Sequence, residues 1–250
     1  MRRLMIVIAT ITIAASCPAH WTEQPDLPDW AQRGTLHWCL HYSTANRELV
    51  DLFADGGQTL IHGGRFDNDE TGEYAESLGL RYMPYVCSRT MTTTHDIAQN
   101  PQLQEAVLLK ADRSEFLAYN NPVRRYGSLH PDTWPNYVRE RVQRVRKYPD
   151  VWAIFFDNAF YPGDDHRPEN VAAWQAWARE RGIDPGDDVP EIYGSENVAQ
   201  SRAFSRDALI AYHHGLREYC HAQDPPLLNC PNSGNAYGLA ALEAGAIDLM

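Results

Sequence analysis

VWAIFFDNAF, residues 151–160, is the stretch that decides the expected fold of this chain. An apolar run from Val151 to Phe156 leads directly into Asp157, and Pro162-Gly163 ends the stretch soon afterwards. A short apolar run between turn residues is typical of a strand that is covered on both faces of a parallel sheet. In barrels of alternating strands and helices, side chains at the carboxyl ends of the strands form the active site. The stretch therefore predicts a functional role for Asp157; capping of the following turn is the alternative.

The rest of the chain alternates between strand and helix patterns. Strands are expected over residues 35–43, 58–64, 81–88, 151–157, 227–232 and 246–250. Helices are expected over residues 45–54, 70–78, 101–110, 135–148, 168–181, 205–220 and 237–245. Most of residues 92–134 fits neither pattern and is expected to be a polar loop. The alternation predicts an α/β protein, a (β/α)8 TIM barrel of which about six of the eight units are present, so that the barrel is incomplete at the C-terminus.

The N-terminus predicts export. Residues 1–17, MRRLMIVIATITIAASC, place two arginines before an apolar run and small residues, as in a secretory signal peptide. The end of this segment is also similar to a bacterial lipobox, in which Cys17 would carry a lipid anchor. The chain is thus divided into a signal peptide, a lead over residues 18–34 and a partial catalytic barrel over residues 35–250. The location is expected to be periplasmic, envelope-anchored or secreted. No second run of about 20 apolar residues follows, so no transmembrane span is expected.

Composition narrows the class of partner. Of the 250 residues 44% are hydrophobic, enough for a sizeable core, and the formal net charge is −11. This charge argues against nucleic acid as a partner, since a nucleic-acid backbone calls for a basic surface. The seven Trp and thirteen Tyr fit a protein that stacks on sugars, with core packing as the alternative for each of them. The cysteines at positions 39, 87, 220 and 230 have no CxxC spacing, although an exported chain could pair them. The three in expected strands, Cys39, Cys87 and Cys230, are expected to act as small buried hydrophobes.

Neither a cofactor nor a metal site is predicted. Gly63-Gly64 is too short for a phosphate-binding loop, and no G-x-S-x-G elbow of a serine hydrolase is present. The alternative is a zinc site, because His37, Cys39 and His41 alternate along one strand face and a fourth ligand from elsewhere would complete it.

Polar residues at the expected strand ends form a candidate ring of donors and acceptors for sugar hydroxyl groups. The predicted substrate-binding residues are His41, Tyr42, His62, Arg65, Arg89, Asn158, Asn229 and Asn232. An Arg or His beside Asp157 would hold this carboxylate in its ionised form. For each residue of the ring, ordinary internal hydrogen bonding is the alternative.

Several stretches resemble the catalytic barrels of glycoside hydrolases. They are IHGGRFDND (61–69), RYMPYV (81–86), SLHPDTWPNYV (128–138) and, above all, DVWAIFFDNAF (150–160). The last is similar in style to the fourth strand of alpha-amylase-like or alpha-galactosidase-like glycosyl hydrolases of bacteria, with Trp152-Ala153 where Asp-Gly is common. The resemblance covers about residues 35–250. It implies that Asp157 is the catalytic nucleophile and that the acid/base comes from a later strand.

Glycoside cleavage typically needs a pair of carboxyl groups that flank the bond. Candidates for the partner of Asp157 are Asp164, Asp165 and Glu196, in loops after its strand, or an acid on a strand that follows residue 250. The expected function is hydrolysis of a glycosidic bond in an oligo- or polysaccharide. The alternatives are a non-catalytic glycan-binding barrel and a zinc-dependent barrel hydrolase.

Overall fold

The computed structural model describes residues 37–130, 132–148, 151–157, 164–190, 198–232, 240–241 and 243–248, with side chains described from Thr44 onward. The chain divides into residues 1–34 and a compact unit of residues 35–250, to which all of the described residues belong. The expected signal peptide and Cys17 lie outside the described residues. Within the described residues, no helix is both long and apolar enough to cross a lipid bilayer.

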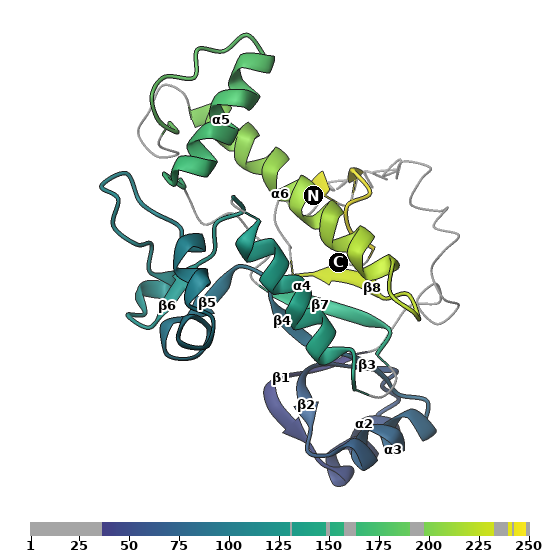
Figure 1. Cartoon of the computed structure of the whole chain (residues 1–250). Helices are drawn as coiled ribbons and strands as arrows, with labels where there is room; N and C mark the ends of the chain where they lie inside the picture. The colour runs from purple at the N-terminus through teal and green to yellow at the C-terminus, as the bar shows by residue number, and fades with distance from the viewer. Residues whose placement is uncertain are drawn as a thin grey trace, which may run out of the picture. The chain divides into compact units, whose positions relative to one another are not determined.

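Parallel strands pair in the order in which they follow one another along the chain (Figure 1). They lie in two three-stranded sheets, β1 (His37–Ala45), β2 (Leu60–Phe66) and β3 (Arg81–Met83), and β4 (Tyr85–Cys87), β7 (Ala153–Asp157) and β8 (Leu228–Pro231). Only Pro84 separates β3 from β4, and proline interrupts a ladder because it has no N–H to donate. The Pro84 carbonyl still accepts a hydrogen bond from the Phe155 N–H at 3.0 Å, and Tyr82 forms a parallel bridge with Val151. The two sheets therefore continue into each other.

Asp248 extends this order by one more position. Its backbone N–H donates to the Asn229 carbonyl in β8 at 3.0 Å, and residues 240, 241 and 243 are helical between the two. The structure thus confirms an α/β protein with parallel sheets. The described residues form an open run of strands in which no closed barrel is seen. The count of eight units stays a prediction.

Helices follow the strands as the sequence predicts. They are α2 (Arg47–Asp55), α3 (Asp69–Ser77), α4 (Thr133–Val145), α5 (Pro168–Glu180) and α6 (Val198–His221). Asn46 and Asn68 cap the first two helices, because their side-chain oxygens accept backbone N–H groups at 3.0 and 2.8 Å. Gly57 and Gly79, both with positive φ, follow the ends of these helices. Helix α6 begins at Val198, earlier than the expected position 205. The sequence prediction missed its first turns because the Ser and Gln there interrupt the apolar period.

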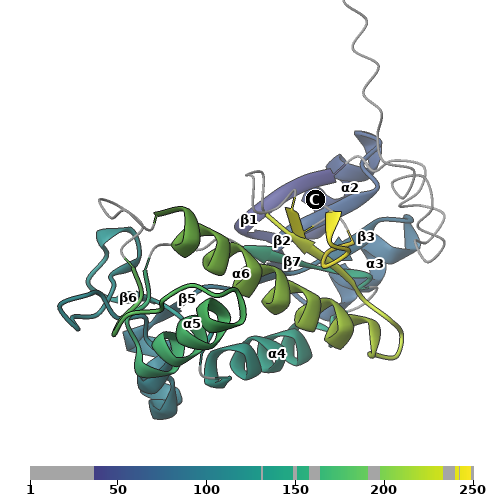
Figure 2. The same ribbon diagram turned by 90° about the horizontal axis from the view of Figure 1, so that it is seen from above.

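The main core lies between the sheet and two of the helices. Both views of the ribbon show α4 and α6 alongside β7 (Figures 1 and 2). The buried side chains at this contact include Val138 and Val142 of α4, Leu209 and Leu216 of α6, and Ile154 and Phe156 of β7. Burial of each such side chain stabilises the fold by about 1.5–3 kcal/mol. Because side chains alternate along a strand, Phe155 and Asp157 point to the opposite face of β7.

Residues 88–130, which we call the insert, depart most from the expected polar loop. The insert contains the antiparallel strands β5 (Thr90–Thr92) and β6 (Arg124–Tyr126), a π-helical turn (Thr93–Ile97) and 3-10 turns (Pro101–Ala106 and Ala118–Asn120). The short helix expected over 101–110 is present in part, as the 3-10 helix Pro101–Ala106. Strands of three residues are too short to give a readable period. The insert packs closely on α4. At Gly127 the indole ring of Trp134 lies so near the backbone that a Cβ atom would collide with it.

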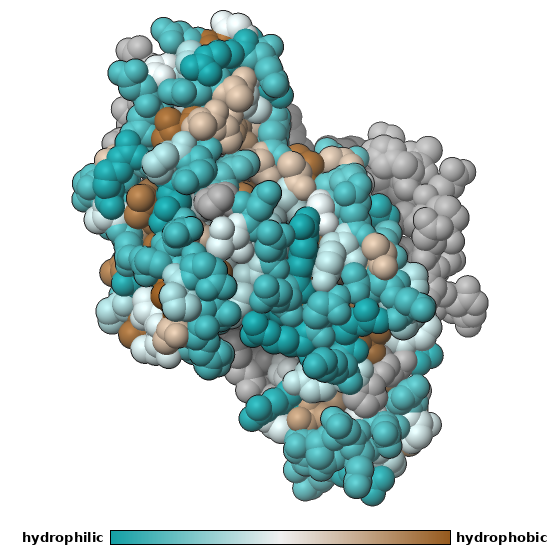
Figure 3. All heavy atoms as spheres, viewed as in Figure 1, coloured by the Kyte–Doolittle hydropathy of each residue, from teal (hydrophilic) through white to brown (hydrophobic). Residues whose placement is uncertain are grey.

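The visible surface is mainly hydrophilic, with hydrophobic residues in small groups (Figure 3). Among the described residues the exposed large hydrophobic side chains are Leu52, Leu78, Tyr119 and Val123. Cys230 is buried as expected, Cys87 is half-buried, and Cys220 in α6 is buried as well. Burial raises the pKa of both Cys220 and Cys230 to about 12.

Candidate functional site

The site is built around Asp157, the last residue of β7, whose side chain is half-buried. The Tyr85 hydroxyl donates a hydrogen bond to Asp157 Oδ2, and the Asn232 side-chain amide donates one to Oδ1. Tyr85 lies in β4, in which Cys87 pairs with Asp157. Asn232 directly follows β8, and its backbone N–H donates to the Phe156 carbonyl at 3.0 Å. Donors from the strands on both sides of β7 therefore orient the carboxylate.

Ser88 fixes the backbone of Asp157. Its N–H and its hydroxyl donate to the Asp157 carbonyl at 2.9 and 2.8 Å. The Ser88 carbonyl in turn accepts the indole N–H of Trp134 at 2.8 Å and the hydroxyl of Tyr212 at 2.9 Å. Ser88 is fully buried, so these bonds are shielded from competing water. Helices α4 and α6 are thereby tied to the main chain that carries the carboxylate.

Aromatic rings lie beside the carboxylate. The Phe155 ring, on the same face of β7 as Asp157, lies 4.4 Å from the His62 ring and 6.2 Å from the Tyr85 ring, centroid to centroid. The insert adds a second group of rings, since Tyr126 lies 5.9 Å from Tyr119 in an edge-on contact. Burial, followed by the neighbouring Tyr126 and Asp157, raises the pKa of Tyr119. The negative charge of Asp157 thus disfavours the ionised form of Tyr119.

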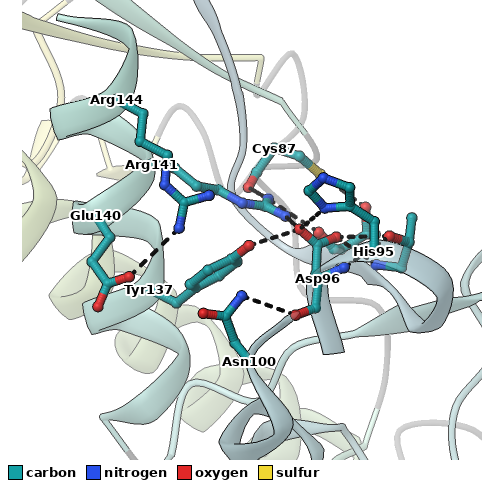
Figure 4. Close-up of polar contacts among 10 residues, drawn as sticks. Cys87, His95, Asp96, Asn100, Tyr137, Glu140, Arg141 and Arg144 are labelled. Carbon is teal, nitrogen blue, oxygen red and sulfur yellow. Dashed lines mark hydrogen bonds and ion pairs between the residues drawn. The ribbon is translucent and has the colours of Figure 1, made fainter. Parts of the chain in front are cut away.

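A buried ion pair anchors the insert to α4 (Figure 4). Asp96 of the insert accepts a hydrogen bond from Arg141 Nη2 at 2.7 Å and from the Tyr137 hydroxyl at 2.8 Å. Burial by itself would raise the pKa of Asp96. The charge of Arg141, followed by hydrogen bonds from the Thr92 N–H and from the side chains of Arg141 and Tyr137, outweighs burial and lowers the pKa to about 2. Arg141 also donates to the Cys87 carbonyl at 2.8 Å. Because Cys87 pairs with Asp157, this ion pair supports the strand end beside the site.

Asp165, one of the predicted partners of Asp157, is fully buried among backbone groups. Its Oδ1 accepts the N–H of Leu109 at 3.4 Å and that of Arg167 at 3.1 Å, and the Ser128 hydroxyl donates to Oδ2. Burial raises the pKa of this carboxyl. The contacts connect the residues after β7 to the insert, so the geometry fits a structural role. Glu196 lies outside the described residues, and Asp164 is described and half-buried.

The predicted substrate-binding residues are placed in different surroundings. Asn232 contacts Asp157 directly, and His62 packs on Phe155 beside it. Arg65 is exposed and lines a recess of about 490 Å³ together with Tyr148. Arg89 is fully buried near Asp165 and His213. Burial raises the pKa of Asp165 and the charge of Arg89 offsets only part of this rise, whereas burial and then the charge of Arg89 lower the pKa of His213.

Asn229 is also fully buried and donates to the His213 carbonyl of α6 at 3.2 Å, which places its side chain on the helix side of β8. His41 and Tyr42 lie in β1, with side chains outside the described set, and Asn158 is outside it entirely.

Sequence reasoning missed three residues of this arrangement: Tyr85, Ser88 and Tyr119. Tyr85 carried a usable signal, because it lies two positions before the strand-end residue Cys87 and so shares its face. Ser88 and Tyr119 carried none, since their roles depend on contacts with distant segments.

The metal hypothesis gains no support from the residues with described side chains, where no three His, Cys, Asp or Glu side chains are grouped closely enough to hold a metal ion. The side chains of His37, Cys39 and His41 are outside that set, so the zinc alternative stays a prediction for them.

Known proteins resemble this chain in structure. No protein-family model and no curated protein sequence matches it. Beta-galactosidases from the haloarchaeon Halorubrum lacusprofundi and from Rahnella sp. R3 match with a TM-score of 0.62 and 14% identity, over 86% of this chain and 38% of theirs. Alpha-L-fucosidase isoenzyme 2 from Paenibacillus thiaminolyticus matches with a TM-score of 0.53 and 16% identity, over 80% of this chain and 33% of that one. At such low identity the likeness concerns the fold: the chain has a fold similar to glycoside hydrolases and spans little more than a third of their length.

Proposed function

We propose that this chain is a glycosidase-like hydrolase that acts on a glycosidic bond of an oligo- or polysaccharide. The observation that carries the proposal is the carboxylate of Asp157 at the carboxyl end of β7, oriented by Tyr85 and Asn232 on the face that also carries aromatic rings. The fold likeness to galactosidases and a fucosidase supports it, although a fold alone does not fix an activity.

In the proposed chemistry Asp157 attacks the anomeric carbon, or stabilises the positive charge that develops there, while a second carboxyl group protonates the leaving oxygen. Hydrogen bonds from Tyr85 and Asn232 aim the carboxylate and reduce its freedom to rotate. We propose that the second carboxyl comes from a segment after β7 or from a later strand. The fully buried Asp165, held by backbone N–H groups, is a weaker candidate than an acid that reaches the face of Asp157.

The test is hydrolysis of p-nitrophenyl galactosides and fucosides of both anomeric forms by the wild-type chain and by Asp157→Asn. The substitution conserves size, so we expect an unchanged melting temperature and a loss of turnover of roughly 10³-fold or more. Asp55→Asn, at an exposed position of α2, is the matched control and should leave turnover unchanged. Undiminished turnover in Asp157→Asn would end the proposal.

A rescue experiment separates the nucleophile from a stabilising carboxylate. Asp157→Ala opens space at the anomeric carbon, and added azide can form the bond to that carbon while p-nitrophenolate leaves without needing a proton. We expect azide to restore release of p-nitrophenolate and to yield a glycosyl azide if Asp157 is the nucleophile. Release that stays independent of azide argues for the stabilising role. Retention of glycans by the wild-type chain without any product release would favour the binding-only alternative.

We also propose that the chain is exported, on the strength of the signal-like residues 1–17 and the lipobox-like Cys17. Mass spectrometry of the mature N-terminus tests both parts. A diacylglyceryl group on Cys17 would support the lipid anchor, cleavage without it would support secretion, and an intact Met1 would contradict export.

A further inference from the structure

Tyr119 of the insert has an unusual backbone and an exposed ring. Its φ is 57° and that of the next residue, Asn120, is 55°, both in the left-handed region. Residues other than glycine occupy this region at an energetic cost, and such positions gather at functional sites. The turn is closed by a hydrogen bond from the Asn121 N–H to the Ala118 carbonyl at 3.0 Å. The backbone is therefore strained at Tyr119, a residue that is 54% exposed.

A series of contacts connects Tyr119 to the strand end that carries the carboxylate of the site. Asp157 is bonded to Ser88, and two residues further on Thr90 pairs with Tyr126 across β5 and β6. The Tyr126 ring is buried and lies 5.9 Å from the ring of Tyr119. The raised pKa of Tyr119, to which the charge of Asp157 contributes after burial and Tyr126, agrees with this placement.

Two other exposed hydrophobic residues, Leu52 and Leu78, differ from Tyr119. Leu52 and Leu78 lie at α2 and at the end of α3, where isolated exposed apolar side chains are ordinary. Tyr119 instead combines an aromatic face, a strained turn and a position within reach of the charge of a candidate catalytic group. A tyrosine ring offers a large rigid contact area at a small cost in side-chain entropy. Such a ring suits a ligand with one apolar face and several hydroxyl groups, which is the surface that a pyranose presents.

We propose that Tyr119 is a binding platform on which one sugar ring of the substrate lies while the neighbouring glycosidic bond is presented to Asp157. The proposal rests on the proposed carbohydrate substrate and adds the residue that selects it. The contribution comes from the face of the ring, so Phe can replace Tyr119 and Ala cannot. Because such a contact is made equally in the ground state and in the transition state, it acts on KM and leaves kcat nearly unchanged.

The test uses Tyr119→Ala and Tyr119→Phe in the full chain, with Leu52→Ala as a control for loss of an exposed apolar side chain. Retention is measured by electrophoresis through gels that contain soluble galactan, fucoidan or glucan. The values of KM and kcat are measured with the p-nitrophenyl glycoside that the wild-type chain cleaves. We expect Tyr119→Ala to weaken retention and raise KM by about tenfold, with kcat within about twofold. Leu52→Ala should match the wild-type chain. Tyr119→Phe keeps the ring and loses only its side-chain hydrogen bond with Tyr126, so its retention and KM should stay close to those of the wild-type chain.

The same substitution made in the Asp157→Asn variant tests sugar binding by Tyr119 separately from the proposed activity. In Asp157→Asn, retention in the same gels should persist, and adding Tyr119→Ala should weaken it as much as in the wild-type background. Unchanged retention and KM in Tyr119→Ala, or an equal loss in Tyr119→Phe, would overturn the platform even where Asp157→Asn is inactive. Loss of retention in Tyr119→Ala alongside full turnover in Asp157→Asn would overturn the catalytic assignment and leave the platform standing. A wild-type chain that shows neither retention nor turnover would overturn both.

Discussion

Asp96 and Asp157 are both held by a tyrosine hydroxyl, yet their surroundings serve different ends. Asp96 lies between the insert and α4, with a side chain that is 10% exposed, and pairs with the guanidinium of Arg141 as well as with Tyr137. Asp157 ends β7, is half-buried, and accepts hydrogen bonds from the neutral groups of Tyr85 and Asn232.

The contrast indicates how one kind of side chain takes two roles. A buried carboxylate with a bound cation satisfies both charges, and such a pair holds two segments in one register. A half-buried carboxylate at a strand end, oriented by an amide and a hydroxyl, is placed to meet a ligand. The Arg141 bond to the Cys87 carbonyl links the two, because the anchor fixes the strand beside the site.

The largest effect is expected when Arg141, the cation that pairs with Asp96, is replaced. In Arg141→Met the carboxylate of Asp96 stays buried without its charged partner, so we expect the free energy of unfolding in urea to fall by about 3–5 kcal/mol. The matched control is Arg144→Met on the same helix, where the Arg144–Glu140 pair is exposed. That change should stay within about 0.5 kcal/mol of the wild-type chain. Equal losses in the two variants would contradict the anchoring role.

Acid titration should separate the anchor from the rest of the chain. The pKa of Asp96 is lowered from 3.8 to about 2 in the folded state, so its stabilising contribution is complete above 3.8 and is lost as the pH falls through 2. The shift corresponds to roughly 2 kcal/mol. Unfolding free energies of the wild-type chain and of Asp96→Asn, measured between pH 5 and pH 2, should converge at the acid end by about this amount. Parallel curves would show that Asp96 does not carry the effect.

The smallest effects are expected when the tyrosine hydroxyls that donate to Asp157 and Asp96 are removed one at a time. Tyr85→Phe removes the hydroxyl that donates to Asp157 while its ring stays beside Phe155, so we expect kcat/KM to fall about tenfold, with stability changed by less than about 1 kcal/mol. Tyr137→Phe removes the corresponding hydroxyl at Asp96 and should lower stability by about 1–2 kcal/mol with little change in kcat/KM. Both variants are measured by the same glycoside assay and urea titration. Swapped outcomes would reverse the roles given to the two carboxylates.

Much of the sheet was predictable, because its signals are local. The apolar run into Asp157 marks β7. The single strand expected over residues 81–88 lies in the predicted place, but Pro84 divides it into β3 and β4. The insert was predictable only as an irregular segment. Its strands are three residues long, and their pairing depends on contacts that sequence periodicity does not encode.

The sequence by itself determined the alternation of strands and helices and the carboxylate that ends β7, since burial and side-chain period act over neighbouring residues. The tertiary structure decided what meets that carboxylate. Tyr85 and Asn232 lie 72 and 75 positions away from Asp157 along the chain, and Asp96 and Arg141 are 45 positions apart. Parallel strands become neighbours only after long crossover connections have folded, so the donors at a strand end are chosen by packing and not by proximity in sequence.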